Sequence, residues 1–336
     1  MNILLTAINA KYIHSNLAVY SLRACAGEYR DAVELAEYTI NNQKDYILEE
    51  LYKRKPDVLC FSCYIWNIDY VTDIAREYKK LCPSVPIWVG GPEVSYEVEA
   101  FLRENPYIDG VMIGEGEDTF RELCGYYAHK RKLSDIAGIA FRKNSTGNST
   151  SVNNIGGNKA GEIVFTSPRP IKNMSEIPFC YDTLDDFSNR IIYYESSRGC
   201  PFSCSYCLSS VDKTLRFRDT EIVKRELKFF IDQKVPQIKF VDRTFNCNHA
   251  HAMELWRFIK ANDNGVTNFH FEISADLLNQ EELELISDMR PGLIQLEIGV
   301  QSTNEKTLAE IHRKTDFEEI TRNSKKIQAR KLFDYN

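Results

Sequence analysis

The sequence predicts an α/β protein in two parts, each built around a parallel sheet. Short apolar runs alternate with amphipathic helical stretches over residues 1–142, and the same rhythm returns from residue 191. Because successive parallel strands need crossover helices, this alternation indicates sheets with both faces covered. Residues 143–161 are rich in Asn, Ser, Thr and Gly without periodicity, so we expect a linker and connecting segment over 143–190. With 336 residues, 43% of them hydrophobic, the chain is long enough for two cores.

The first part, residues 1–142, contains strands and helices in strict alternation. The expected strands are Asn2–Ala7, Ala32–Tyr38, Asp57–Ser62, Pro86–Val89 and Ile108–Ile113. The expected helices lie near 16–28, 43–54, 67–81, 93–104 and 117–129. Glycines follow the last two strands, at Gly90 and Gly91 and at Gly114 and Gly116. Ligands of open α/β sheets bind at this carboxyl edge, which makes both turns candidate binding loops.

The second part, residues 191–336, contains four expected βα units. Its strands are expected at Ile191–Ser196, Gln237–Val241, Asn268–Ile273 and Leu293–Ile298. Its helices are expected near 219–233, 248–262, 279–289, 303–311 and 316–330. A fifth strand would begin in the last stretch, 331–336.

Composition excludes several classes of protein. The formal net charge of −6 gives no basic surface for tracking phosphates, and the basic run 129–132 is most simply a solvated helix end. The chain has no run of 18 apolar residues, and its first residues do not form a signal peptide, so we expect a soluble cytoplasmic protein. Ten scattered cysteines do not indicate a disulfide framework, and clustered ones in a reducing compartment indicate metal or redox chemistry.

One cluster of cysteines stands out, directly after the strand at 191–196. Cys200, Cys204 and Cys207 are spaced C-x3-C-x2-C. A [4Fe–4S] cluster normally takes four thiolates, so three would leave one iron open for a small molecule. Structural zinc is the alternative and needs a fourth ligand. Candidates for that ligand are Cys180, Cys247, His249 and His251.

The pattern C-x3-C-x2-C, with Tyr206 before its last cysteine, resembles the signature of radical S-adenosylmethionine (SAM) enzymes. The segments KFVDRTF (239–245), FEISADLL (271–278) and LEIGVQSTNEKTL (296–308) resemble that family's next strands. The resemblance implies a partial TIM-barrel-like core over 191–336, in which the three cysteines hold the cluster. Its open iron chelates SAM, and an electron from the reduced cluster yields a 5′-deoxyadenosyl radical. Tyr206 is then expected near the adenine, and Glu297, Gln301 and Ser302 become expected SAM contacts.

Carboxylates at the ends of the strands of the second part form a further candidate group. Asp242, Glu272 and Asp276 end or border strands and are expected to face the barrel mouth, from which barrel enzymes build their sites. The alternative for each is an ordinary carboxylate that caps a helix or turn.

The first part resembles the flavodoxin-like, Rossmann-type cobalamin-binding domain that precedes many radical SAM cores. VGGPEVS (89–95) and VMIGEGEDTFREL (111–123) carry the resemblance. It implies a cobalamin site formed by Ser62, Gly90, Gly91, Gly114, Glu115 and Gly116, where glycines allow close approach of the cofactor.

The family's D-x-H-x-x-G pattern is absent, and His14 does not lie in it. We therefore expect cobalamin without a protein imidazole on cobalt. Cys60 and Cys63 point to opposite faces of a strand and are expected to be buried small residues, not a chelating pair.

Together the two resemblances imply a cobalamin-dependent radical SAM enzyme that transfers a methyl group to an unactivated carbon. Other radical reactions, such as cyclisation, oxidation or RNA methylthiolation, are alternatives, and a non-catalytic zinc module is another. The acidic charge argues against an RNA substrate. Expected partners are a small-molecule or peptide substrate and an electron donor such as flavodoxin or ferredoxin, with no membrane and no nucleic acid.

Barrels of this family have six βα units, and four can be counted here. We therefore expect a core truncated after the fourth unit, with an uncovered strand edge that favours association.

Overall fold

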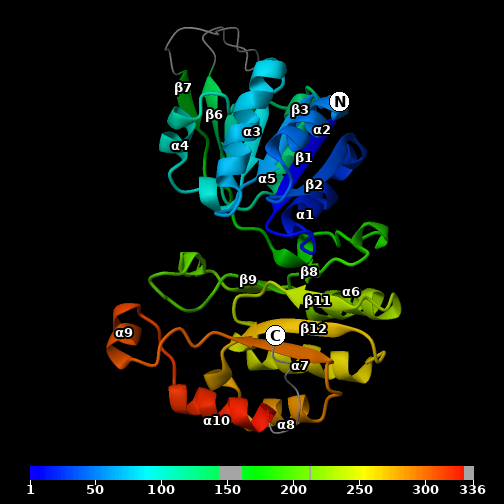
Figure 1. The fold of residues 1–336 in the computed structure, drawn as a ribbon, viewed down its shortest axis with the longest axis vertical. Coiled ribbons are helices and arrows are strands. Elements are labelled where there is room, and N and C mark those ends of the chain that lie inside the picture. The colour runs from blue at the N-terminus through cyan, green and yellow to red at the C-terminus, as the bar shows by residue number, and fades with distance from the viewer. Residues whose placement is uncertain (144–160, 212, 329–336) are drawn as a thin grey trace. The chain divides into compact units, whose positions relative to one another are not determined.

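A computed structural model describes residues 1–143, 161–211 and 213–328 (Figure 1). The expected linker at 143–161 falls almost entirely outside the described residues, as does the expected start of a fifth strand at 331–336. The chain divides into two compact units. The N-terminal unit comprises 1–172 and 177–190, and the C-terminal unit comprises 173–176 and 191–336. Within the described residues, every helix is too short or too polar to span a lipid bilayer.

The described part of the N-terminal unit forms a seven-stranded sheet in the order β2-β1-β3-β4-β5-β6-β7. Its strands are β1 (Ile3–Asn9), β2 (Val33–Thr39), β3 (Val58–Ser62), β4 (Ile87–Gly90), β5 (Gly110–Met112), β6 (Ile139–Lys143) and β7 (Glu162–Phe165). β1 to β5 are all parallel in the order 2-1-3-4-5, which is the flavodoxin-like winding that we predicted. β6 and β7 were not predicted and pair antiparallel beyond β5.

Helices connect these parallel strands as expected from the periodicity. They are α1 (Leu17–Cys25), α2 (Lys44–Arg54), α3 (Ile68–Leu81), α4 (Val98–Glu104) and α5 (Glu117–Tyr127). α1 packs beside α5, and α2 packs beside α3, so four of these five helices form two pairs. α4 begins later than predicted, because Pro92–Val94 first forms a short 3-10 turn after Gly91.

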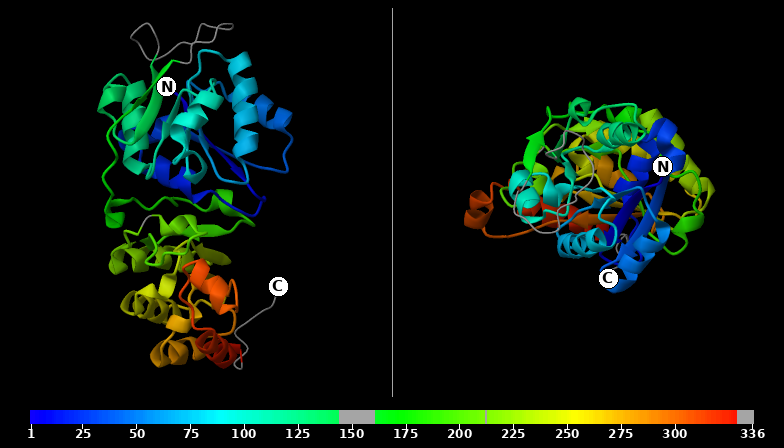
Figure 2. Two further views of the ribbon diagram at one scale, coloured as in Figure 1. Left: turned by 90° about the vertical axis from the view of Figure 1, so that its left-hand side faces the viewer. Right: turned by 90° about the horizontal axis from the view of Figure 1, so that it is seen from above.

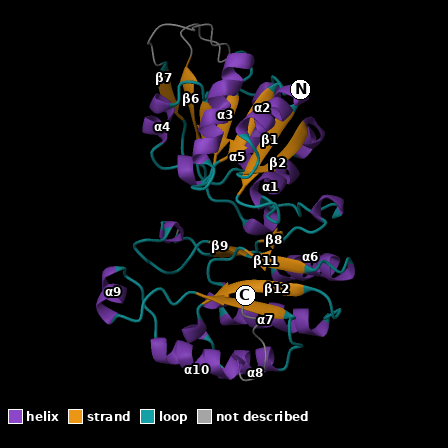
Figure 3. Ribbon diagram, viewed as in Figure 1, coloured by secondary structure: helices purple, strands orange, loops and turns teal. Residues whose placement is uncertain are grey.

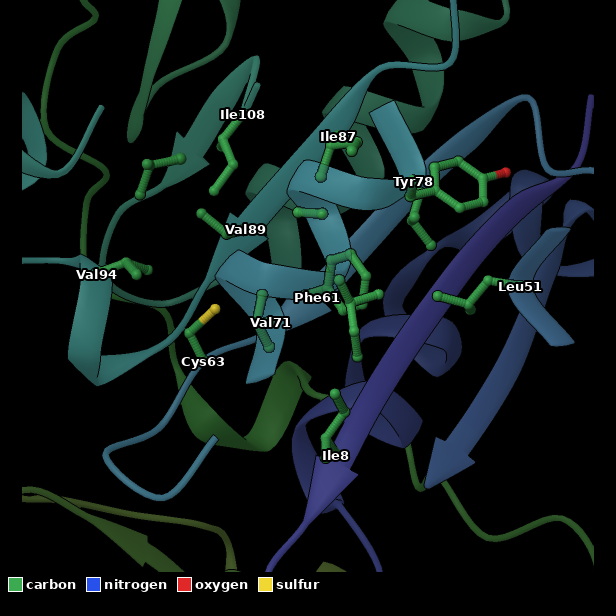
Figure 4. Close-up of a cluster of buried hydrophobic side chains, with 14 of the residues drawn as sticks. Ile8, Leu51, Phe61, Cys63, Val71, Tyr78, Ile87, Val89, Val94 and Ile108 are labelled. Atoms are coloured by element: carbon green, nitrogen blue, oxygen red, sulfur yellow. The ribbon is translucent and has the colours of Figure 1, made fainter. Parts of the chain in front are cut away.

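The core of the N-terminal unit is largely aliphatic and surrounds the central strands of its sheet. Every residue of β1 and β3 is buried. Figure 4 shows Phe61, Val89 and Ile108 of the sheet region packed with Val71 and Tyr78 of α3. Cys60 and Cys63 are free and fully buried, as expected for small core residues.

The described part of the C-terminal unit contains a four-stranded parallel sheet in the order β13-β12-β11-β8. Its strands are β8 (Ile192–Tyr194), β11 (Gln237–Phe240), β12 (Asn268–Ile273) and β13 (Ile294–Ile298). Neighbours in sequence are neighbours in the sheet, which is the winding of a barrel. A separate antiparallel pair joins β9 (Ser197–Arg198) to β10 (Arg216–Phe217).

The helices of this unit lie along one face of the second sheet, except for α9, which lies beyond the carboxyl ends of its strands (Figures 2 and 3). They are α6 (Thr220–Asp232), α7 (His249–Ala261), α8 (Gln280–Ser287), α9 (Glu305–Glu310) and α10 (Phe317–Gln328). α6 packs on α7, α7 on α8, and α8 on α10. The last residues of the helix expected at 316–330 lie outside the described residues.

The strands of the second sheet alternate between an apolar and a polar face. Phe245 and Phe271 pack against Trp256 of α7 with tilted and edge-on rings, and Phe240 packs against both phenylalanines. The residues between them on the strands are polar and include Lys239, His270, Glu272 and Glu297. This polar face is the one that a closed barrel encloses.

Candidate active site

The cysteine loop begins two residues beyond the end of β9 and is closed at its base by the β9–β10 pair, in which Ser197 faces Phe217. Gly199 stands at the entrance with φ +94, and a Cβ there would lie 2.5 Å from the carbonyl oxygen of Thr214. Because only glycine permits that contact and that backbone conformation, it brings the two ends of the loop together. The cysteine loop therefore follows the carboxyl end of β8, the first barrel strand, and its two ends are held together.

The three cysteines share one short segment but differ in exposure. Cys200 and Cys204 are buried, and Cys207 is half-buried. The amide of Cys207 donates to the carbonyl of Cys204 at 3.1 Å, and the amide of Ser210 donates to the carbonyl of Cys207 at 3.0 Å. Within the described ranges, no three His, Cys, Asp or Glu side chains are gathered to hold a metal ion. The type of ligand nevertheless fits an iron–sulfur cluster, because the loop carries three thiols.

The zinc alternative needs a fourth ligand, and both candidate histidines have other partners. His249 lies 2.9 Å from a carboxylate oxygen of Glu282, and His251 Nε2 lies 3.1 Å from the hydroxyl of Ser196. Cys247 lies close enough to Cys200 of the cysteine loop to interact with it electrostatically. Burial raises the pKa of its thiol to about 11, and the nearby Cys200 adds to the shift.

Asp242 differs from the expectation that it faces the barrel mouth. Its carboxylate is fully buried and accepts hydrogen bonds from the amide of Ser196 at 3.0 Å and from the hydroxyls of Ser196 and Ser197, both at 2.6 Å. The pairing of Val241 with Tyr194 continues beyond the strands and draws Asp242 under this segment. Burial raises the pKa of Asp242 to about 6. Asp242 therefore holds the base of the cysteine loop.

Tyr206 is half-exposed and is tied to the end of β13 through a residue that the sequence did not indicate. Arg313 donates from Nη1 to the Tyr206 hydroxyl at 3.2 Å and from Nη2 to the Gly299 carbonyl at 2.6 Å. Gln301, beside Gly299, has a left-handed backbone with φ +64. The hydroxyl of Ser302 accepts from the amide of Asn304 at 3.1 Å. The structure thus joins Tyr206 to the Gly299–Ser302 turn.

Glu297 and Glu272 lie together on the polar face of the second sheet. Lys239 Nζ lies 2.9 Å from the Glu297 carboxylate and 3.6 Å from that of Glu272, and His270 lies 3.0 Å from Glu297. The hydrogen bond from Lys239 lowers the pKa of Glu297, whereas burial raises that of Glu272. Asp276 instead accepts from the hydroxyl of Ser274 and the amide of Asp316, which fits the capping alternative.

Lys239, His270 and Arg313 are the functional candidates that sequence reasoning missed. Lys239 and His270 could have been found, because each is polar between buried neighbours on a predicted strand. Arg313 carries no such signal.

In the N-terminal unit, the predicted cobalamin residues gather at the carboxyl ends of β3, β4 and β5. Gly91 has φ +121, and a Cβ there would lie 2.4 Å from the carbonyl oxygen of Cys63. Gly114 has φ +75 and open space where a Cβ would point. Ser62 is buried at the end of β3 and accepts from Asn16 at 3.2 Å. Gly90 ends β4, so the edge offers glycine backbone at two adjacent strands.

The other two residues of this edge flank the start of α5. Gly116 immediately precedes that helix, and a Cβ there would meet Leu22 of α1 at 3.0 Å. Glu115 accepts from the amide of Lys172 at 3.4 Å. The space beside Gly91 and Gly116 is thus filled by this unit's own atoms, whereas Gly114 has the open space that fits close approach of a bulky cofactor.

Aromatic side chains lie at the same edge, in the loops after β1 and β3. Tyr64 and Trp66 stack with ring centroids 4.5 Å apart, and Trp66 Nε1 donates to the carbonyl of Ile8 at 3.3 Å. Trp66, Ile65 and Tyr12 are exposed. His14 also lies in the loop after β1, where its backbone carbonyl accepts a hydrogen bond from the Asn9 side chain at 3.1 Å. The edge therefore presents an apolar aromatic surface beside the glycine turns.

The half-barrel with a three-cysteine loop on its first strand defines the class as radical SAM, and the model of the Radical SAM superfamily matches residues 194–334. The model of the B12 binding domain matches residues 3–124, in the unit with the flavodoxin-like order. The chain belongs to the family of radical SAM proteins that carry a B12-binding domain. The resemblance noted in the sequence is confirmed.

Named relatives agree with this family. An uncharacterised methyltransferase of Pyrococcus horikoshii is 31% identical over 218 residues, 62% of this chain and 44% of its own length. The cobalamin-dependent radical SAM methyltransferase TokK of Streptomyces tokunonensis is 29% identical over 68% of this chain and 33% of its own length. The chain thus spans less than half the length of these relatives.

A solved structure shows the same fold at low identity. The radical SAM methyltransferase TsrM from Kitasatospora setae, with cobalamin and a [4Fe–4S] cluster bound, aligns with a TM-score of 0.71 and 17% identity. The alignment covers 99% of this chain and 68% of that one.

Proposed function

We propose that the chain is a cobalamin-dependent radical SAM enzyme that transfers a methyl group to an unactivated carbon. The observation that carries the proposal is the three-cysteine loop on the first strand of a parallel half-barrel, in one chain with a flavodoxin-order B12-binding domain. Methyl transfer is supported by the two methyltransferases among the relatives.

In this proposal Cys200, Cys204 and Cys207 hold a [4Fe–4S] cluster that has one iron open to SAM. When bound, these cofactors supply a 5′-deoxyadenosyl radical, and methylcobalamin supplies the methyl group. Tyr206 and the Gly299–Ser302 turn orient SAM, and Asp242 fixes the base of the loop through Ser196 and Ser197. Two of these three thiols are buried and the third is half-buried.

The polar face of the second sheet carries charged side chains on β11, β12 and β13. Lys239 lies between Glu297 and Glu272 and joins the two carboxylates in one network, although its single positive charge balances only one of them. Such a network on the inner face of a barrel is suited to hydroxyl and ammonium groups of SAM or substrate. We place Glu297 as the SAM contact and Glu272 beside it.

In the N-terminal unit the turns at Gly90-Gly91 and Gly114-Glu115-Gly116, with Ser62, form the cobalamin site. The open space at Gly114 would permit close approach of the nucleotide tail. The exposed rings of Trp66 and Tyr12 would offer apolar contact to the corrin, and we propose that the chain supplies no imidazole to cobalt. A one-electron donor such as flavodoxin or ferredoxin and a reducing, cytoplasmic location complete the proposal, because reductive cleavage of SAM needs an electron and thiols stay reduced in such a compartment.

The test is anaerobic reconstitution of the chain with iron, sulfide, cobalamin and SAM labelled with a deuterated methyl group. We expect iron and not zinc after purification, 5′-deoxyadenosine after addition of dithionite, and deuterated methylcobalamin. Mass spectrometry against cell extract then identifies a labelled product. A colourless chain that holds one zinc and no iron would contradict the proposal.

A further inference from the structure

Residues 177–190 belong to the N-terminal unit, although they end just before β8 of the other unit. Tyr181 and Phe187 of this segment are buried, and their ring centroids lie 6.1 and 5.0 Å from that of Tyr20 on α1. The hydroxyl of Tyr20 in turn donates a hydrogen bond to the carboxylate of Glu37 on β2. The segment therefore packs as part of the N-terminal unit and reaches the side chain of Glu37.

Arg190 ends this segment and binds two different parts of the same unit. Its Nη1 donates to the Glu37 carboxylate at 2.8 Å, and its Nη2 donates to the carbonyl of His14 at 2.8 Å. The guanidinium also lies over the ring of Tyr12, 6.0 Å from the centroid. His14 and Tyr12 belong to the loop between β1 and α1, residues 10–16, which we call the β1 loop. One planar side chain thus binds both β2 and the β1 loop.

Glu37 is the acceptor on which this arrangement converges. Its side chain is only 9% exposed, and that of Arg190 is 12% exposed. Besides the bonds from Arg190 and Tyr20, its carboxylate accepts hydrogen bonds from the side chain of Asn9 and the backbone amide of Asn16, both at 2.9 Å. Asn9 ends β1 and Asn16 precedes α1, so these bonds fix both ends of the β1 loop. A largely buried carboxylate needs such partners to stay charged.

The network continues from the β1 loop to the edge that we assign to cobalamin. Asn16 caps α1 and donates from its side chain to the hydroxyl of Ser62 at 3.2 Å. Ser62 ends β3 and is one of the proposed cobalamin residues. Tyr12 of the β1 loop is exposed at the same edge. The position of the loop at this edge therefore depends on Glu37 and Arg190.

We propose that Arg190 and Glu37 are positioning residues that hold the β1 loop in the arrangement that binds cobalamin. This inference rests on the proposed function. Without Arg190, the largely buried carboxylate of Glu37 has no cation beside it, and the loop loses the bond to the carbonyl of His14. The loop then opens more readily. Cobalamin has to order it on binding, so the affinity for cobalamin falls.

The experiment uses the full chain and compares the wild type with Arg190→Ala, Arg190→Lys and the double variant Glu37→Gln/Arg190→Ala. Arg30→Ala is the matched control, because Arg30 binds the same segment through an ion pair with Asp182 in which both side chains are exposed. The first readout is hydrogen exchange of the peptide that covers the β1 loop, measured without cobalamin. The second is the Kd for hydroxocobalamin from absorbance titrations, with the visible spectrum of the bound form.

We expect the amides of the β1 loop to exchange about tenfold faster in Arg190→Ala than in the wild type, because a hydrogen-bonded ion pair is lost. The Kd for hydroxocobalamin should rise about tenfold in the same variant. Arg190→Lys should give intermediate values, because lysine keeps the charge but not the planar fork. The double variant should also show faster exchange and weaker binding, and Arg30→Ala should match the wild type in both readouts.

Wild-type exchange of the β1 loop in Arg190→Ala would overturn the inference. A wild-type Kd in a variant whose loop exchanges faster would do the same, as would an equal effect of Arg30→Ala. If Arg190→Ala does not fold, the double variant decides on the same two readouts, because it leaves no unpaired carboxylate at Glu37. A wild type that binds no hydroxocobalamin would reject the cobalamin site of the proposed function, whereas the exchange data would still decide whether Arg190 holds the loop.

Discussion

Replacing Asp242 by Asn should remove a pH dependence from the stability of the C-terminal unit. The carboxylate is fully buried, and burial raises its pKa from the ordinary 3.8 to about 6. Between those values the folded state binds more protons than the unfolded state, so stability falls as pH rises. At 1.36 kcal/mol per pKa unit, the full change is about 3 kcal/mol. This loss of stability is absent below about pH 3.8 and complete above about pH 6.

Hydrogen exchange measured by peptide mass spectrometry suits this test, because the amide of Ser196 donates directly to Asp242. The opening free energy of the peptide that contains Ser196 is measured for the wild type and Asp242→Asn from pH 4.5 to 7.5. We expect the wild type to lose about 2 kcal/mol relative to the variant over this range. Asp232→Asn, at an exposed carboxylate of α6, is the control and should show no such trend. A difference that is flat, or that grows in favour of the wild type as pH rises, would refute this account of Asp242.

Three further predictions concern the N-terminal unit. Gly91→Ala should cost about 2–4 kcal/mol in urea unfolding, because a Cβ would lie 2.4 Å from the Cys63 carbonyl, whereas Gly114→Ala should cost about 1 kcal/mol. Equal losses in the two variants would contradict the close approach at Gly91. Trp66→Ala should weaken cobalamin binding about tenfold in absorbance titrations, since it removes the stacked aromatic surface. His14→Ala should leave the spectrum of bound cobalamin unchanged, and a shift of its visible bands would show that His14 reaches cobalt.

The elements that sequence predicted well are those with long periodic patterns. β12 was predicted at its observed bounds because Asn268–Ile273 alternates polar and apolar side chains. β7 was missed because Glu162–Phe165 is short and never fully buried. β9 and β10 pair over two residues each, which is too short for any periodic signal.

The candidate site divides in the same way between local and long-range information. The three cysteines lie within eight residues, so their spacing alone singled them out as a candidate site. Asp242 is held by Ser196, 46 residues away, and Tyr206 meets Arg313, 107 residues away. Contacts over such separations depend on the barrel winding, and a single sequence does not contain them. For this reason the strand-end position of Asp242 could be predicted, but its burial could not.

The most direct test of the central claim is the iron content of single cysteine variants after anaerobic reconstitution, measured together with 5′-deoxyadenosine formed from SAM and dithionite. Cys200→Ala, Cys204→Ala and Cys207→Ala should each lose the cluster and SAM cleavage. Cys63→Ala, at a fully buried thiol of the N-terminal unit, should keep both. Full iron and sulfide content with SAM cleavage in Cys204→Ala would contradict the assignment of the loop as the cluster site.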